Sequence, residues 1–291
     1  MDIDVALVRR LVDQQFPQWR TFSIRPIEPG GWDNRSFRLG TELTVRLPSH
    51  AAYAAQVTKE QRWLPELAAR LPVAIPTPVA EGRPSDGYPW PWSVYRWIDG
   101  ETAHVARIPD RQAFAAEVAY FLVALQKADA AGGPPPGPHN FYRGGHIGVY
   151  DQETRQAVRE LDGRIDAEAA TAVWKAACEG AWGASPVWVH GDMHPSNLLV
   201  RDGRLSAVID FGCLGVGGPA CDVAIAWTFF SAASREEFRR CLAADEGTWA
   251  RARGWVLWKA LITMADPDTE APKRAEAWRV LDEVMQEFKH W

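Results

Sequence analysis

The spacing of apolar residues changes along the chain, and this change predicts where helices and strands lie. Apolar side chains at positions 5, 8, 11, 12 and 16 share one helical face, which predicts a helix over 5–16. Short apolar runs then predict strands at Arg35–Leu39 and Leu43–Leu47, followed by a helix at Gln56–Arg70. Two further strands are predicted at Val73–Ala80 and Trp92–Ile98.

From residue 110 onward the pattern is mainly helical, beginning with the alanine-rich segment Arg111–Asp129. Strands therefore dominate the first third of the chain and helices dominate the rest. This predicts an α+β fold with two lobes, a small β-rich lobe over residues 1–98 and a larger helical lobe over residues 99–291. Within the second lobe, Gly132–Tyr150 is rich in proline and glycine and is expected to form a long surface or binding loop.

Composition narrows the possible functions. A net charge of −5 over 291 residues argues against a nucleic-acid partner, because phosphate binding needs clustered Lys and Arg. No run approaches 18 apolar residues, and acids follow Met1 where a signal peptide would be basic, so a cytoplasmic protein without a membrane partner is expected. The four cysteines lack CxxC spacing and are expected to be free thiols, and most of the 15 tryptophans are expected in the core.

Charge also differs between the two predicted lobes. Residues 1–98 contain 12 Lys and Arg against 10 Asp and Glu, whereas residues 99–291 contain 20 against 27. The first lobe therefore favours an anionic ligand and the second a cationic one, although acids on solvated helix surfaces would give the same count.

The most informative stretch is SPVWVHGDMHPSNLLVRDGRLSAVIDFGCLGVGG, residues 185–218. A strand at Val187–His190 precedes a loop, and a hairpin with strands Asn197–Val200 and Leu205–Phe211 follows around a turn at residues 201–203. This order brings together the side chains of Asp192, Asn197 and Asp210. Carboxylate and amide oxygens suit Mg²⁺, and phosphoryl transfer mainly needs the phosphates, the metal and the attacking hydroxyl to be held in place.

The motifs VHGDMHPSN and VIDFG resemble those of the aminoglycoside phosphotransferases and their macrolide phosphotransferase relatives, which share the protein-kinase fold. The Asp–Asn spacing of five and the following Asp-Phe-Gly match the kinase catalytic loop and metal-binding motif. The resemblance implies that Asp192 is the catalytic base and that Asn197 and Asp210 bind Mg²⁺. It also implies that His190 and Asp222 anchor the loop.

The first lobe carries a less specific resemblance, which implies ATP or GTP as the phosphate donor. Gly30–Ser36 is similar to the turn that positions the nucleotide, with Ser36 near the phosphates. LTVRLP and KEQRWLPEL are similar to the motifs of the phosphate-binding residue and its acidic partner, here Arg46 and Glu60. The stretch Tyr95–Ile98 is similar to the base-binding hinge, so the remaining nucleotide-binding candidates are Arg96, Trp97 and Ile98.

Two departures from the family pattern are visible. Arg46 stands where kinases have Lys, and its planar guanidinium binds phosphate with a different geometry. Gly218 stands where relatives often have Asp before the proline, and a local effect is expected there.

Other functions are less consistent with the sequence. His190 and His194 have zinc-site spacing, but Gly191 and Pro195 disfavour the required helix. A GxSxG nucleophile motif and a GxGxxG dinucleotide motif are absent. Two alternatives stay open beside the antibiotic phosphotransferase: a metabolic kinase for choline, homoserine or an amino sugar, and a catalytically silent nucleotide-binding protein. The acceptor is expected to be a cationic small molecule with a hydroxyl, and the protein a monomer or dimer.

Overall fold

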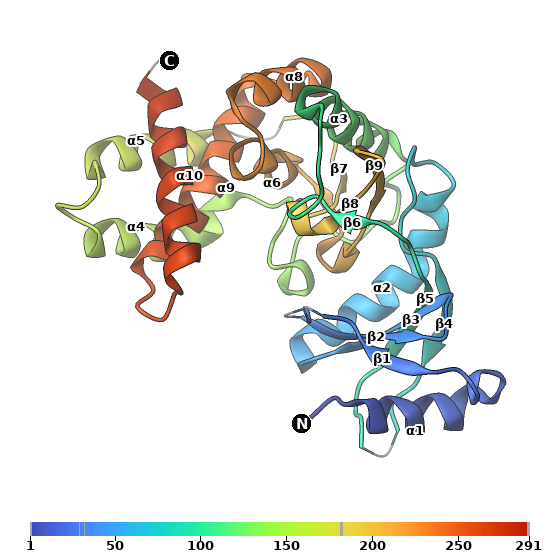
Figure 1. The fold of residues 1–291 in the computed structure, drawn as a ribbon. Helices are drawn as coiled ribbons and strands as arrows, with labels where there is room; N and C mark the ends of the chain where they lie inside the picture. The colour runs from blue at the N-terminus through green and yellow to red at the C-terminus, as the bar shows by residue number, and fades with distance from the viewer. Residues whose placement is uncertain (1, 29, 32, 86, 181–182, 290–291) are drawn as a thin grey trace.

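The computed structural model describes residues 2–28, 30–31, 33–85, 87–180 and 183–289. An α+β arrangement is confirmed, with a β-rich N-terminal region and a helical C-terminal region (Figure 1). The division at residue 98 stays a prediction. The N-terminal elements are α1 (Val5–Gln15), β1 (Ile24–Pro26), β2 (Asn34–Leu39), β3 (Leu43–Pro48), α2 (Ala51–Ala68), β4 (Pro78–Gly82) and β5 (Trp92–Arg96).

The N-terminal strands form one antiparallel sheet in the order β1-β2-β3-β5-β4. In β3, Leu43, Val45 and Leu47 are buried against α1, while Arg46 between them lies on the other side of the pleat. Figure 1 shows α1 on the outer side of this sheet and α2 on the side that faces the C-terminal region. The alternation of β3 therefore directs the Arg46 side chain toward the rest of the molecule.

The C-terminal region has a large core and two small sheets. Its strands are β6 (Glu101–Thr102), β7 (Val187–Val189), β8 (Leu198–Arg201), β9 (Arg204–Val208) and β10 (Gly215–Gly217), and its helices are α3 (Arg111–Lys127), α4 (Asp151–Glu160), α5 (Ala167–Glu179), α6 (Ala220–Val223), α7 (Ile225–Thr228), α8 (Ala232–Leu242), α9 (Glu246–Ala265) and α10 (Ala271–Lys289). β10 pairs with β7, and β8 lies between β6 and β9. Leu64 and Leu67 of α2 join this core, which couples the two regions by apolar contact.

Two predicted elements begin several residues away from the predicted position. Helix α2 begins at Ala51 rather than at Gln56, because its first turn is mostly alanine and shows no apolar period; His50 caps it by accepting a hydrogen bond from Ala52 N. The strand predicted at Val73–Ala80 begins only at Pro78, and before it Ala74 forms an isolated bridge with Ala207.

Cysteines, tryptophans and helix hydropathy complete the description of the fold. All four cysteines are free. Seven of the 12 tryptophans that the structure describes are buried, at positions 92, 174, 188, 227, 249, 255 and 258. No helix in the described part of the chain has the length and apolar character needed to cross a bilayer. The loop at Gly132–Tyr150 holds only two short 3₁₀ turns, Pro138–Asn140 and Ile147–Tyr150.

Candidate active site

One buried carboxylate anchors the start of the loop after β7 through hydrogen bonds. Asp222 is fully buried and accepts hydrogen bonds from the backbone N–H groups of His190 (2.8 Å) and Gly191 (2.7 Å). Gly191 has φ +84°, and a Cβ atom there would come within 2.4 Å of the Cys213 carbonyl oxygen. Burial raises the pKa of Asp222 above its usual value, against the lowering effect of His190 and of these two N–H donors.

His190 links this loop to the end of the hairpin. Its Nδ1 accepts a hydrogen bond from Asp192 N (3.2 Å), and its Nε2 lies 3.0 Å from the carbonyl oxygen of Ile209. This pattern fits the tautomer with the proton on Nε2. The ring also packs edge-on against Phe211, with 4.5 Å between the ring centroids. His190 and Asp222 thus lie where the sequence resemblance implies anchoring residues.

The structure brings together the three oxygen-bearing side chains singled out from the sequence. Asn197 Nδ2 donates to the carboxylate of Asp192 (3.0 Å) and to its backbone carbonyl (2.9 Å). The Asn197 carbonyl accepts a hydrogen bond from Ile209 N (2.8 Å), which brings Asn197 beside Asp210. Asp210 has φ +65°, so the chain leaves the ladder of β9 here, and the strand predicted to reach Phe211 ends at Val208. Asp192 is exposed and Asn197 is buried.

Arg46 connects the N-terminal sheet to Asp210 and Glu60. Its Nη2 lies 2.8 Å from Asp210 Oδ1, and its Nη1 lies 3.7 Å from Glu60 Oε1. Tyr95 donates a hydrogen bond to the other oxygen of Glu60. The Arg46 side chain is 15% exposed and that of Glu60 is 6% exposed, so the Arg46–Glu60 pair expected from the sequence is a buried ion pair.

Burial and pairing act in opposite directions on the charged groups of this cluster. Burial raises the pKa of Asp210, but the charge and hydrogen bond of Arg46 outweigh it and hold the pKa below its usual value. Burial lowers the pKa of Arg46, and Asp210 and Glu60 reverse this, so Arg46 is charged throughout the working range. For Glu60, burial prevails over Arg46 and raises the pKa.

The remaining nucleotide-site candidates lie on the same sheet. Ser36 is directly opposite Arg46 in the β2–β3 register. The Arg96 N–H donates to Thr77 O (2.9 Å) and the Trp97 N–H to Glu42 O (2.7 Å), so neither backbone donor is open to a ligand.

The Ile98 N–H has no hydrogen bond among the described residues, so it is the one hinge donor of the three that is open. Residue 32, inside the turn predicted at Gly30–Ser36, lies outside the described residues.

Sequence reasoning missed Lys59, which is 8% exposed. Its Nζ donates to the carbonyl oxygen of Gly212 (2.7 Å) and lies 3.2 Å from His139 Nδ1. Burial lowers the pKa of Lys59 to about 8, although Cys213 and Glu60 oppose the shift. The one sequence feature that points to Lys59 is its position next to Glu60 in KEQRW. Nothing in that stretch predicts a contact with His139 or Gly212, which are distant in the chain.

Asp33, in the glycine turn, is a second residue near the site that the sequence did not single out. Its pKa is raised by burial, and the carboxylates of Asp210 and Asp192 raise it further. The turn therefore brings a third carboxylate toward the two predicted in the C-terminal region.

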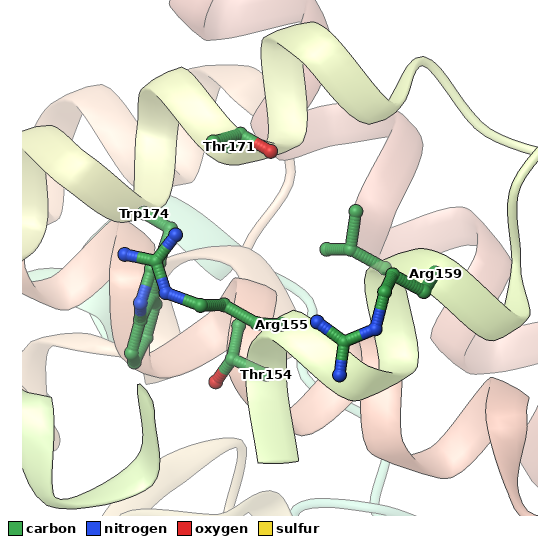
Figure 2. Close-up of a pocket in the computed structure, with 6 residues that line it drawn as sticks. Thr154, Arg155, Arg159, Thr171 and Trp174 are labelled. Carbon is green, nitrogen blue, oxygen red and sulfur yellow. The ribbon is translucent and has the colours of Figure 1, made fainter. Parts of the chain in front are cut away.

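A separate cavity of about 160 Å³ lies between α4 and α5 (Figure 2). Its lining residues are Thr154, Arg155, Val158, Arg159, Thr171 and Trp174. None of them belongs to the predicted site. Arg155 is engaged by Asp151, with 2.8 Å from its Nε to each carboxylate oxygen.

Comparison with known proteins identifies the family. The sequence matches the phosphotransferase enzyme family over residues 23–255. The chain belongs to this family. A comparison with curated proteins gives no match.

Solved structures support the fold of this family member. The structure of aminoglycoside 2′-phosphotransferase-IIIa with GDP has 19% sequence identity and a TM-score of 0.73, covering 98% of this chain and 99% of that one. The streptomycin–ATP complex of APH(2″)-IIa has 17% identity and a TM-score of 0.63, covering 98% and 97%. Macrolide 2′-phosphotransferase MphH from Brachybacterium faecium has 22% identity and a TM-score of 0.61, covering 96% and 98%. The kinase-like fold expected from the sequence is thus confirmed.

Proposed function

We propose that this phosphotransferase moves the γ-phosphoryl group of ATP or GTP to a hydroxyl group of a small molecule. The observation that carries the proposal is the contact between the Arg46–Glu60 pair of the N-terminal region and Asp210, beside Asn197 and Asp192. This arrangement joins a cation that suits phosphate, a pair of oxygen ligands and an exposed carboxylate. Phosphoryl transfer requires these three components, and little covalent chemistry beyond them.

In this proposal the nucleotide lies against the N-terminal sheet. Arg46 binds the phosphates, Glu60 orients Arg46, and Ser36 on the facing strand contributes a hydroxyl beside it. The Ile98 N–H contacts the base, whereas Arg96 and Trp97 are left with their carbonyls and side chains because their N–H groups are engaged.

Asp210 and the Oδ1 atom of Asn197 suit Mg²⁺, because both are hard oxygen donors and Asn197 uses only its Nδ2 in the hydrogen bonds to Asp192. When bound, Mg²⁺ would neutralise charge on the phosphates. Asp192 accepts the proton of the acceptor hydroxyl as its oxygen attacks the γ-phosphorus and the nucleoside diphosphate leaves. The hydrogen bond from Asn197 holds the Asp192 carboxylate in place for this step.

The proposed acceptor is an amine-bearing small molecule of the aminoglycoside or macrolide antibiotic type. Two observations support it: structural neighbours act on those classes, and residues 99–291 contain 20 Lys and Arg against 27 Asp and Glu. A metabolic acceptor such as choline, homoserine or an amino sugar is the second candidate, and a pair of cations described below favours homoserine, the one of these three that carries a carboxylate. The proposal also includes a cytoplasmic location, a monomer or dimer, and lobes that divide at residues 98 and 99.

The test combines nucleotide binding with phosphate transfer. ATP and GTP are each expected to raise the melting temperature only with Mg²⁺, and Asp210→Asn is expected to raise the half-saturating Mg²⁺ concentration about tenfold, the effect of exchanging a charged for a neutral ligand. Transfer of labelled γ-phosphate is then measured over a panel of antibiotics and metabolites. Nucleotide binding without transfer to any acceptor, and without slow hydrolysis, would support the catalytically silent alternative instead.

A further inference from the structure

Two cations beside the candidate base have no anionic partner. Arg143, in the Pro/Gly-rich loop, and Lys259, on α9, form no ion pair with any residue that the structure describes. The Nε atom of Arg143 is buried and has no hydrogen-bond partner there. A buried donor without a partner is costly, and in a native site it points to a ligand or an ordered water.

An aromatic surface lies beneath both cations. The Arg143 guanidinium lies 4.9 Å from the ring centroid of Trp255 and 5.5 Å from that of Trp258, and Lys259 Nζ lies 5.9 Å from the Trp258 ring. Trp258 is stacked on Tyr150, with 4.0 Å between their centroids and 21° between their planes. This surface fixes the two cations by cation–π contact and leaves their hydrogen-bond donors free for a ligand.

The loop that carries Arg143 is held in a demanding conformation. Phe141 and Tyr142 have φ of +52° and +56°, which is unfavourable for residues other than glycine. Asn140 is fully buried and secures the loop, accepting from Gly137 N (3.0 Å) and donating to the carbonyl oxygen of Arg143 (3.0 Å). Backbone strain that is held in this way occurs preferentially at functional sites.

The loop that carries Arg143 lies beside β10, which pairs with the strand β7 that leads to Asp192, and Gly218 N donates to Gly144 O at 2.8 Å. Lys259 is an exposed residue of α9; partial burial and repulsion by Arg143 lower its pKa, and Asp192 and Glu153 oppose the shift. Both Asp192 and Arg143 act on the thiol of Cys213. Glu153 is the nearby acid, and its carboxylate accepts a hydrogen bond from Trp258 Nε1 at 3.0 Å rather than pairing with a cation.

We infer that the acceptor carries an acidic group, a carboxylate or a phosphate, which Arg143 and Lys259 bind while the acceptor hydroxyl meets Asp192. The inference rests on the proposed phosphate transfer, and for the acceptor it favours an acid-bearing molecule over the aminoglycoside type. This anion site is separate from the nucleotide site. Arg46, which is proposed to bind the nucleotide phosphates, lies in the N-terminal region and is paired with Asp210 and Glu60, whereas Arg143 and Lys259 belong to the C-terminal region. An amine elsewhere on the same acceptor is compatible with the acids of that region, but a purely polycationic acceptor would be repelled at this position.

The test uses three small probes that differ in one group: glycerate, glycerol 3-phosphate and glycerol. Each is titrated calorimetrically into the protein, once alone and once with Mg²⁺ and a non-hydrolysable ATP analogue filling the nucleotide site. Glycerate, glycerol 3-phosphate or both are expected to bind in a saturable way, and glycerol is not. The arm that binds identifies the anion as carboxylate or phosphate.

Substitutions then locate the anion. Arg143→Gln and Lys259→Met are each expected to weaken anion binding at least tenfold while leaving the affinity for Mg²⁺–nucleotide unchanged, which also shows that each variant is folded. Arg159→Gln and Lys175→Met remove the same charges from exposed positions on α4 and α5 and are the matched controls, expected to bind as the wild type does.

Binding of neither anion, equal binding of glycerol, or wild-type anion affinity in both variants would overturn the inference. Failure of the proposed function has a different signature: no Mg²⁺-dependent nucleotide binding by the wild type, whatever the anions do.

Discussion

The residues proposed to bind the nucleotide and those proposed to bind the acceptor differ in whether their cations are paired with acidic side chains. We call these two groups the nucleotide side and the acceptor side. On the nucleotide side, Arg46 contacts both Asp210 and Glu60, and Tyr95 completes the set with a hydrogen bond. On the acceptor side, Arg143 and Lys259 lie over aromatic rings and form no ion pair within the described part of the chain. The first group is organised before any ligand arrives, whereas the second leaves donors for a ligand to satisfy.

The difference indicates how each side gains specificity. A paired cluster holds its side chains in fixed positions, which suits an invariant ligand such as a triphosphate. An unpaired cluster favours whichever acceptor supplies the missing charge, because a buried donor left without a partner costs free energy. Selectivity for the acceptor is therefore expected to depend on charges that the folded protein leaves unmatched.

The largest expected effect comes from Asp192, which serves both sides. Asp192→Ala is expected to lower turnover on the order of 10²–10⁴-fold, the usual range for loss of a positioned base. Steady-state phosphate transfer measures the effect, with nucleotide affinity and melting temperature as controls for folding. Turnover close to that of the wild type would show that another group accepts the proton.

Breaking the nucleotide side is expected to have the next largest effect. Arg46→Ala removes the cation between Asp210 and Glu60 and is expected to weaken nucleotide binding by about 1.5–3 kcal/mol, roughly 10–150-fold. Arg46→Lys is expected to recover only part of this, because an ammonium group cannot reproduce the planar guanidinium contacts. Calorimetry with Mg²⁺–ATP decides, and equal affinity of wild type and Arg46→Ala would contradict the assignment.

A smaller effect on stability is expected at Lys59. Its pKa in the folded protein is about 8, below the ordinary value of 10.5, so between these values the unfolded chain holds the proton more tightly. The free energy of unfolding is therefore expected to rise with pH over this window, by about 1 kcal/mol from pH 7.5 to 9.

Cys213 works in the opposite direction, because burial raises its pKa to about 12. The Lys59 contribution is therefore measured by comparison. The change in the free energy of unfolding between pH 7.5 and pH 9, determined by urea unfolding, is expected to be more positive for the wild type than for Lys59→Met. Parallel pH profiles for the two proteins would refute it.

The smallest expected effect tests the charge of the acceptor. Glu153→Gln removes a negative charge near Lys259 but keeps an oxygen for Trp258 Nε1. For an acidic acceptor KM is expected to fall roughly twofold, the scale of an exposed charge pair, and for a cationic acceptor it is expected to rise. The sign of the change in KM separates the two acceptor classes, and Glu160→Gln, at an exposed position near the end of α4, is the control.

Sequence patterns predicted the groups whose relation is set by a short stretch of chain. Asp192 and Asn197 belong to one loop, and Asp202 and Gly203, both with positive φ, form the tight turn that returns the chain to Asp210. The contact of Arg46 with Glu60 was predictable because a strand and the helix after it bring both to one side of the sheet.

The acceptor side could not be predicted in the same way. Arg143 and Lys259 come from separate segments, and their meeting depends on how α9 packs against the Pro/Gly-rich loop. The net charge of residues 99–291 suggested a cationic ligand, but a count over a whole region does not describe the few groups around one side chain. Two cations without an ion-pair partner among the described residues thus occur in a region that is acidic overall.

Lys59 and Glu60 are neighbours on α2, about 100° apart around its axis. Lys59 donates to the Gly212 carbonyl, and Glu60 lies next to Arg46, which reaches Asp210. The N-terminal region is therefore attached to residues 210–212 at two points, through α2 and through β3. Any swing of the N-terminal region away from this segment must break both contacts, and we expect them to break together.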